Sequence, residues 1–320
     1  GNQKKFSTNI YEAVQVNDIL LSSNNFVNKF GFNNNFNSIL KNVNSDGKNS
    51  SKFKDNAQSE ILTMLSYNMD IPLIKSNSKY NNLLTPKISL RHSPNASKNL
   101  KEENRLLNAD NIFSLNRIGF DQTIEGGTSL TLGVDYEKKN QDDNDTLLSS
   151  KIATVFRDEI NENLPISSTL GKTQSDFVGQ INFIPNENFK FNYNYLINND
   201  LDEVNLHKLD NTFQINNFVN TFTFYEENNL IGKKSYYEND ITYNFNEKNS
   251  LSFRTRENKT DNLTEYYNLI YEYKTDCLIA SFEYNKKFYE DRNLVPSENL
   301  FLSLTIYPIT TYERSLYKKW

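Results

Sequence analysis

Side chains that could perform acid–base or nucleophilic chemistry are scarce in this chain of 320 residues. It has two histidines: His92 stands beside Arg91 near the expected end of a strand, and His207 lies within an alternating stretch. No Gly-x-Ser-x-Gly sequence is present to hold a nucleophilic serine, and we find no Ser/His pair for a triad. We therefore predict that the chain has no catalytic residue and is not an enzyme.

Metal ligands and cofactor-binding loops are equally scarce. One cysteine and two distant histidines cannot form the ligand cluster that a zinc site requires. The acidic run 141–145 lacks the glycine and glutamate spacing of an EF-hand calcium loop, and there is no glycine-rich phosphate loop. The sequence predicts neither a metal site nor a cofactor.

The single cysteine, Cys277, cannot form a disulfide within this chain. It is either a free thiol or paired with a cysteine on another segment or chain. The sequence begins at Gly1 and shows no signal peptide. Together these features lead us to expect a fragment that lacks an N-terminal part.

The composition favours strands with one apolar and one polar face. Only 37% of the residues are hydrophobic and the mean hydropathy is -0.71, yet the chain carries 22 Phe and 19 Tyr, which disordered chains lack. No apolar run approaches the roughly 18–20 residues of a membrane-spanning helix. The net charge is -5 and no basic block occurs, so nucleic acid is not an expected partner.

Apolar and polar residues alternate over most of the chain. The stretch 267–273 is apolar or aromatic at every odd position, and 278–284 continues the alternation beyond the turn at Cys277. We count about fifteen or sixteen such strands of roughly eight to twelve residues, the length of strands tilted across a bilayer. Strands of soluble β-sandwiches are shorter, and a β-solenoid would show a fixed repeat period. The predicted fold is all-β, an antiparallel transmembrane β-barrel.

The alternation also predicts which residues face the barrel lumen, and the connections predict its orientation. Short connections alternate with longer ones, as periplasmic turns alternate with outer loops in such barrels. This pattern places the turn of Cys277 on the periplasmic side. The expected lumen residues are Asn33, Asn35, Asn37, Ser129, Thr131, Asn182, Asn192, Asn194, Arg254 and Glu283.

Three stretches, taken together, resemble the LptD family of lipopolysaccharide (LPS) assembly proteins, also called organic solvent tolerance proteins. The segment 111–121 contains Asn116, Arg117, Gly119 and Asp121, and is similar to a family motif that is one residue longer before the glycine. The segment 86–95 resembles the approach to that motif, and 273–277 resembles the family's C-terminal cysteine hairpin. The resemblance spans roughly 17–308.

The resemblance implies a Gram-negative outer-membrane barrel of about 26 strands, of which residues 1–308 would form the C-terminal portion. Residues 309–320 would be a short C-terminal tail. The implied partners are an LptE-like plug lipoprotein, lipopolysaccharide, the outer membrane, and a periplasmic LPS-transport bridge through a missing N-terminal domain. The implied function is insertion of lipopolysaccharide into the outer leaflet through a lateral gate between the first and last strands.

The resemblance also assigns expectations to particular residues. Cys277 becomes a candidate for a disulfide with the N-terminal region. Family members carry two adjacent cysteines here, whereas Leu278 follows Cys277, so only one such cross-link is possible. The strand expected to be last, 300–307, becomes one lip of the gate, with the apolar residues Leu300, Leu302, Leu304 and Ile306.

Other functions remain open at this stage. A porin-like outer-membrane solute channel would have an unobstructed lumen and conduct ions as an isolated barrel. A structural or adhesive β protein would be water-soluble without detergent.

Overall fold

A computed structural model describes the chain except for residues 1–9, 51–52, 230–231, 289–295, 309 and 320. The described residues form 18 antiparallel strands in one sheet, which confirms the predicted fold class. The strands are β1 (Tyr11–Ser22), β2 (Phe26–Val27), β3 (Asn33–Lys48), β4 (Gln58–Asp70), β5 (Leu73–Ser76), β6 (Tyr80–Ser93), β7 (Gly127–Asn140), β8 (Thr146–Arg157), β9 (Phe177–Asn186), β10 (Phe189–Ile197), β11 (Val204–Ile215), β12 (Phe218–Asn229), β13 (Gly232–Asn246), β14 (Asn249–Asn258), β15 (Leu263–Lys274), β16 (Leu278–Lys287), β17 (Ser297–Ile306) and β18 (Thr310–Lys319).

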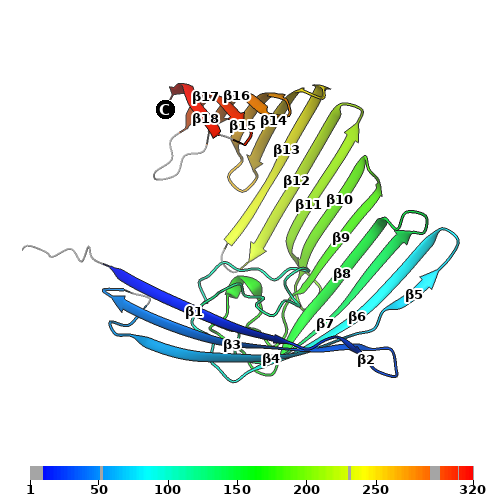
Figure 1. The fold of residues 1–320 in the computed structure, drawn as a ribbon, viewed down its shortest axis with the longest axis vertical. Helices are drawn as coiled ribbons and strands as arrows, with labels where there is room; N and C mark the ends of the chain where they lie inside the picture. Colours follow the sequence, from blue (N-terminus) through cyan, green and yellow to red (C-terminus); the bar gives the residue numbers. More distant parts are fainter. Residues whose placement is uncertain (1–9, 51–52, 230–231, 289–295, 309, 320) are drawn as a thin grey trace, which may run out of the picture.

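The long strands pair in sequence order, and the two short strands lie beside the main ladder. β1 pairs with β3, β3 with β4, β4 with β6, and each later strand with the next one. β2 adds to β3 and β5 to β6. Figure 1 shows the sheet curving into an open barrel, with β1 and β18 at the two ends of the arc. Among the described residues, β1 and β18 do not pair with each other.

The C-terminal end differs from the expected tail. Residues 310–319 form β18, which pairs with β17 from Glu298 to Ile306. The prediction of a short tail at 309–320 was therefore wrong, and the edge strand of the sheet is β18 rather than the strand at 300–307. Leu300, Leu302, Leu304 and Ile306 lie on β17, between β16 and β18. The apolar alternation in 312–317 is too weak to have signalled this strand.

The outer face of the sheet is apolar. Side chains at alternate positions of successive strands are exposed although they are large and hydrophobic, as a surface embedded in lipid requires. They include Phe36, Leu132, Phe183, Phe222, Tyr267 and Phe282. The odd positions of 267–273 all contribute, as the alternation predicted: Tyr267, Leu269, Tyr271 and Tyr273 are each at least 36% exposed.

Two long connections fold into the concave side of the sheet and form its core. The first is residues 94–126, between β6 and β7, and the second is 158–176, between β8 and β9, with a short 3-10 helix at Ile166–Ser168 (Figure 1). We call these the luminal loops. Their apolar side chains cluster with inward residues of the sheet: Leu100, Leu107, Ile112, Ile118, Leu164 and Leu170 pack with Ala153, Val155, Val178, Leu196 and Leu206. Each buried leucine, isoleucine or valine of this cluster contributes about 1.5–3 kcal/mol.

A glycine on β7 lets the first luminal loop approach the sheet closely. A Cβ at Gly133 would lie 2.8 Å from the Phe113 ring and 2.9 Å from the Ala153 Cβ. The segment 111–121 that resembles the family motif is therefore not a strand but a series of turns lying against β7. Glu125 and Gly126, which resemble a hairpin turn in sequence, instead end this loop. No helix in the described part of the chain is long and apolar enough to cross a membrane.

Candidate functional site

The first luminal loop is fixed to the sheet by a buried ion pair. Arg117 donates from Nε to Glu125 Oε2 at 2.7 Å and from Nη2 to Glu125 Oε1 at 2.5 Å. The guanidinium also donates to two inward hydroxyls of β7, Thr131 Oγ1 and Ser129 Oγ, each at 2.9 Å. Ser129 and Thr131, which the alternation predicted to face the lumen, therefore bind Arg117. Through these two hydrogen bonds the first luminal loop is attached to β7.

Two further arginines from the sheet surround the same carboxylate. Arg157, the last residue of β8, donates from Nη1 to Glu125 Oε1 at 2.6 Å and from Nη2 to the Gly126 carbonyl. Arg91 of β6 donates to the Ser114 carbonyl at 2.7 Å. All three arginines and Glu125 are buried. Because a single carboxylate faces three guanidinium groups, its removal would leave buried positive charge uncompensated.

The environment of Glu125 decides its protonation state. Burial alone would raise the pKa of this carboxyl group, but the charge and hydrogen bonds of Arg117, with the charges of Arg91 and Arg157, lower it to about 2. Glu125 is therefore ionised at neutral pH. We call Arg91, Arg117, Glu125 and Arg157 the charge cluster.

The other residues of the motif shape the turn that carries Arg117. Asn116 accepts a hydrogen bond from the Gly119 backbone N–H at 3.2 Å and donates to the Phe120 carbonyl at 3.2 Å. Gly119 has a φ of 68°, in the left-handed region that glycine adopts without strain. Asp121 is exposed, and its side chain has no hydrogen bond or ion pair within the described residues. Of the four motif residues, only Arg117 reaches the charge cluster.

The second luminal loop is joined to the first and to β11. Asn161 donates to Ser97 Oγ at 3.1 Å, and Arg105 N donates to Ser167 Oγ at 3.0 Å. Asp176 accepts a hydrogen bond from Asn205 at 2.8 Å. Burial raises the pKa of Asp176, against the opposing effects of Asn205, Lys172 and Thr169. The two loops therefore form one plug attached to β6, β7, β8 and β11.

Beyond the plug, the inner face of the sheet is lined with polar side chains that bond to one another. On β9 and β10, Asn192 donates to Asn182, and Asn194 donates to Asn192 at 2.5 Å. On β13 to β16, Arg254 pairs with Asp240 at 2.7 Å and Asn268 donates to Glu283 at 2.9 Å. Asn182, Asn192, Asn194, Arg254 and Glu283 are among the residues that the alternation predicted for the lumen, whereas Asp240 and Asn268 are additional. Such a wall suits a hydrated path for polar groups.

Cys277 and the two histidines take no part in the charge cluster. Cys277 is exposed in the turn between β15 and β16. His92 bonds Thr128 Oγ1 at 3.0 Å, and His207 bonds the Tyr193 hydroxyl at 2.7 Å. Both histidines stand on the outer face, not in the lumen. Within the described residues, no three His, Cys, Asp or Glu side chains are grouped to hold a metal ion.

Comparison with known protein families now decides what this barrel is. The family LptD, LPS transport system D, matches residues 35–233, a span that runs from within β3 to the start of β13 and includes both luminal loops. The chain belongs to the LptD family. It is accordingly an outer-membrane barrel of a Gram-negative bacterium in the LPS transport system, as the three motifs predicted.

Comparison with individual proteins adds less than the LptD match. No curated protein matches the sequence. Among solved structures, mutants of the porin of Rhodopseudomonas blastica are similar in architecture. One has 9% sequence identity and a TM-score of 0.35, covering 87% of this chain and 86% of the porin. Another has 7% identity and a TM-score of 0.34, covering 93% and 98%. Values this low carry no functional argument.

Sequence reasoning identified Arg117 but missed the residues it works with. The residues predicted from the sequence as candidates do not include Glu125, Arg91 or Arg157. A usable signal was present: Arg91, Arg157 and Glu125 are charged residues at or beside strand ends whose neighbours alternate. Charge at such a position requires a partner when it faces inward. The partner could not be named, because all three meet only through the path of the luminal loop.

Proposed function

We propose that this LptD barrel inserts lipopolysaccharide into the outer leaflet through a lateral opening at the β18 edge. The observation that carries the proposal is the position of β18: among the described residues it is an edge strand of the sheet and pairs only with β17. A free edge presents unpaired backbone N–H and C=O groups that can pair with another strand, and only that one row of hydrogen bonds must break for the two strands to separate again. It is therefore the place where a wall of the barrel opens most easily.

The lumen and the outer face support opposite parts of an amphiphile. The inner wall offers amide, carboxylate and guanidinium groups such as Asn192, Arg254 and Glu283 to sugars and phosphates. The outer wall is apolar and suits acyl chains. An opening at an edge connects the two surfaces, so the head can travel in the hydrated lumen while the chains pass into the bilayer.

We further propose an LptE-like lipoprotein as the partner that fills the rest of the lumen. The luminal loops lie against β1, β3, β4 and the strands from β6 to β12, whereas the polar inner face of β13 to β16 lies away from them (Figure 1). A periplasmic LPS-transport bridge would deliver the substrate through an N-terminal domain. A porin-like channel is the weaker reading, because the luminal loops fill part of the lumen that a diffusing solute would need.

The lateral opening is tested by closing it. A cysteine in β18 would be cross-linked to the first barrel strand of the full-length protein, and new lipopolysaccharide at the cell surface would be measured. Export should fall when the cross-link forms and recover on reduction. The matched control cross-links Thr305 and Thr311, whose hydroxyls already lie 3.2 Å apart on β17 and β18. Undiminished export with the edge locked would reject the lateral route.

A further inference from the structure

The lumen contains a hollow of about 420 Å³ between the first luminal loop and the wall formed by β12 and the start of β13. Its volume lies within the range of about 300–1,000 Å³ that is typical of ligand sites. Residues of the segment 104–119 line it on the loop side, and Tyr225, Glu227 and Lys234 line it on the sheet side. Tyr225 packs against the core of the luminal loops, so this part of β12 faces inward. We call the hollow the luminal pocket.

Two cationic side chains line the luminal pocket, Arg105 on the loop side and Lys234 on the sheet side. Both residues are exposed, and neither side chain forms an ion pair within the described part of the chain. Arg105 Cζ lies 4.7 Å from the centroid of the Phe120 ring, and Lys234 Nζ lies 5.5 Å from that of Tyr225. Contacts with ring faces position the two cations but leave N–H donors of both available to a ligand.

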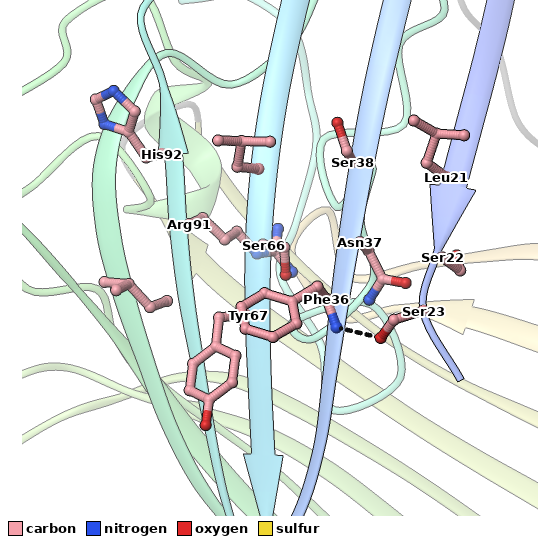
Figure 2. A pocket seen from close by; sticks show the side chains of 12 residues that line it. Leu21, Ser22, Ser23, Phe36, Asn37, Ser38, Ser66, Tyr67, Arg91 and His92 are labelled. Carbon is pink, nitrogen blue, oxygen red and sulfur yellow. Dashed lines mark hydrogen bonds between the residues drawn. The ribbon is translucent and has the colours of Figure 1, made fainter. Parts of the chain in front are cut away.

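The charge cluster beside the luminal pocket adds positive potential. Arg117 belongs to both, and the cluster sets three guanidinium groups against one carboxylate. Arg91 Nε and Nη1 have no hydrogen-bond partner among the described residues, and Figure 2 shows this side chain running from β6 to end beside Ser66 of β4. The one carboxylate that lines the pocket, on Glu227, accepts a hydrogen bond from the Tyr225 hydroxyl. Positive charge therefore exceeds negative charge around the pocket, which favours an anionic ligand.

Side-chain amides of the loop supply groups that suit hydroxyls. Asn104 lines the luminal pocket, is exposed, and has no side-chain hydrogen bond within the described residues. Asn108 Oδ1 accepts from the backbone N–H groups of Asp110 and Asn111, each at 2.9 Å, so the amide nitrogen of Asn108 remains for a ligand. An amide both donates and accepts, as a sugar hydroxyl does. Cations together with amides are the groups that a phosphorylated sugar requires.

We propose that the luminal pocket binds a phosphorylated sugar of lipopolysaccharide, with its phosphate between Arg105 and Lys234 and its hydroxyls at the two amides. A guanidinium binds phosphate through parallel N–H bonds. This inference rests on the proposed passage of lipopolysaccharide through the lumen and names one binding site on that route. The β12–β13 connection lies three connections before the turn of Cys277, which is predicted to be periplasmic, and hence on the outer side. The head group would be bound near the end of its passage.

Photo-cross-linking in cells tests the site in the full-length protein. A photoreactive amino acid replaces Glu103, the exposed neighbour of Asn104, or, in a separate strain, Asn192 on the inner wall. Both positions should form lipopolysaccharide adducts. The double variant Arg105→Gln, Lys234→Gln should reduce the Glu103 adduct at least about tenfold, because two charge-assisted hydrogen bonds are lost. The Asn192 adduct should remain.

The matched control is the double variant Lys101→Gln, Lys259→Gln. It removes the same charge from the same loop and from the β14–β15 connection, at residues that do not line the luminal pocket. Every variant is checked for the heat-dependent gel mobility of a folded barrel. An adduct at Asn192 with none at Glu103, equal losses in the two double variants, or a protein adduct at Glu103 in place of lipopolysaccharide would overturn the luminal pocket. Absence of adducts at both positions would reject the passage through the lumen itself.

Competition separates the sugar from its phosphate. Cross-linking of lipopolysaccharide at Glu103 is repeated with the purified full-length protein in the presence of glucose 6-phosphate, glucose or inorganic phosphate at equal concentrations. Glucose 6-phosphate should lower the adduct yield more than either of the other two. Equal competition by inorganic phosphate would show that the pocket recognises only an anion, and would overturn the assignment of a phosphorylated sugar.

Discussion

Arg117 and Glu125 form two parallel hydrogen bonds, Nε to Oε2 at 2.7 Å and Nη2 to Oε1 at 2.5 Å, inside the first luminal loop. Both side chains are buried. The pair closes the end of a loop that crosses the lumen, and Arg157 ties the same carboxylate to β8 at 2.6 Å. The position of the loop therefore depends on one carboxylate.

Replacing Arg117 should release the first luminal loop. Arg117→Ala leaves Glu125 buried without its main partner, a change that costs about 3–5 kcal/mol for a broken buried ion pair. Because β6 to β8 keep their ladder hydrogen bonds, the barrel itself should remain folded. Hydrogen exchange followed by mass spectrometry should show faster exchange in residues 94–126 and unchanged exchange in β13 to β16.

The matched control removes an exposed ion pair of the same loop. Lys151 and Asp110 lie 3.3 Å apart, and the Asp110 side chain is 70% exposed. Exposed pairs contribute about 0–1 kcal/mol, so Lys151→Ala should leave the exchange of the first luminal loop unchanged. Equal effects from the two substitutions would show that the charge cluster does not hold the loop.

Acid should loosen the luminal loops through Glu125. The pKa of Glu125 is about 2 in the folded protein against 4.5 ordinarily, so its ionised form stabilises the fold. That stabilisation, about 3 kcal/mol from the pKa difference, is complete above pH 4.5 and is lost as the pH falls from 4.5 towards 2. Pepsin cleavage within 94–126, normalised to an unfolded substrate, should increase over this range.

The Glu125→Gln variant separates the protonation of Glu125 from acid-induced unfolding caused by other groups. The glutamine cannot ionise, so pepsin should cleave the Glu125→Gln variant within 94–126 already at pH 4.5. Its cleavage should then not increase further as the pH falls towards 2. A step of the same size in the variant would mean that other groups control the loop.

The strands could be predicted from the sequence because lipid and water impose a period of two on each of them. That pattern placed Asn192, Arg254 and Glu283 correctly on the inner face. It failed where this constraint is weak: β18 carries few apolar residues at alternate positions, so this strand was not predicted. The charge cluster depends on contacts between β6, β8 and a loop, and such long-range contacts leave no periodic signal.

Gly133 should be intolerant of a larger side chain. Its missing Cβ leaves room for Phe113, whose ring would lie 2.8 Å from a methyl group at this position. Gly133→Val should displace the ring and destabilise the packing of the first luminal loop by about 1–3 kcal/mol. Exchange in 94–126 reports the loss.

A second substitution tests the cause of the Gly133 effect. Phe113→Ala removes the ring, so adding it to Gly133→Val should cost less than the sum of the two single changes. Strict additivity of the two effects would place the strain elsewhere, against Ala153 on β8.

Because 273–277 resembles the C-terminal cysteine hairpin of the LptD family and Cys277 is exposed in the β15–β16 turn, Cys277 should form a disulfide with a cysteine on another segment or chain. A disulfide across a long loop stabilises by about 2–4 kcal/mol. Cys277→Ser should therefore abolish the mobility shift between reduced and non-reduced gel samples and lower the yield of mature barrel. Thr275→Ser in the same turn, which keeps the hydroxyl that accepts from Leu278 N at 3.2 Å, is the control. A gel mobility identical in wild type and Cys277→Ser would show that the thiol is free.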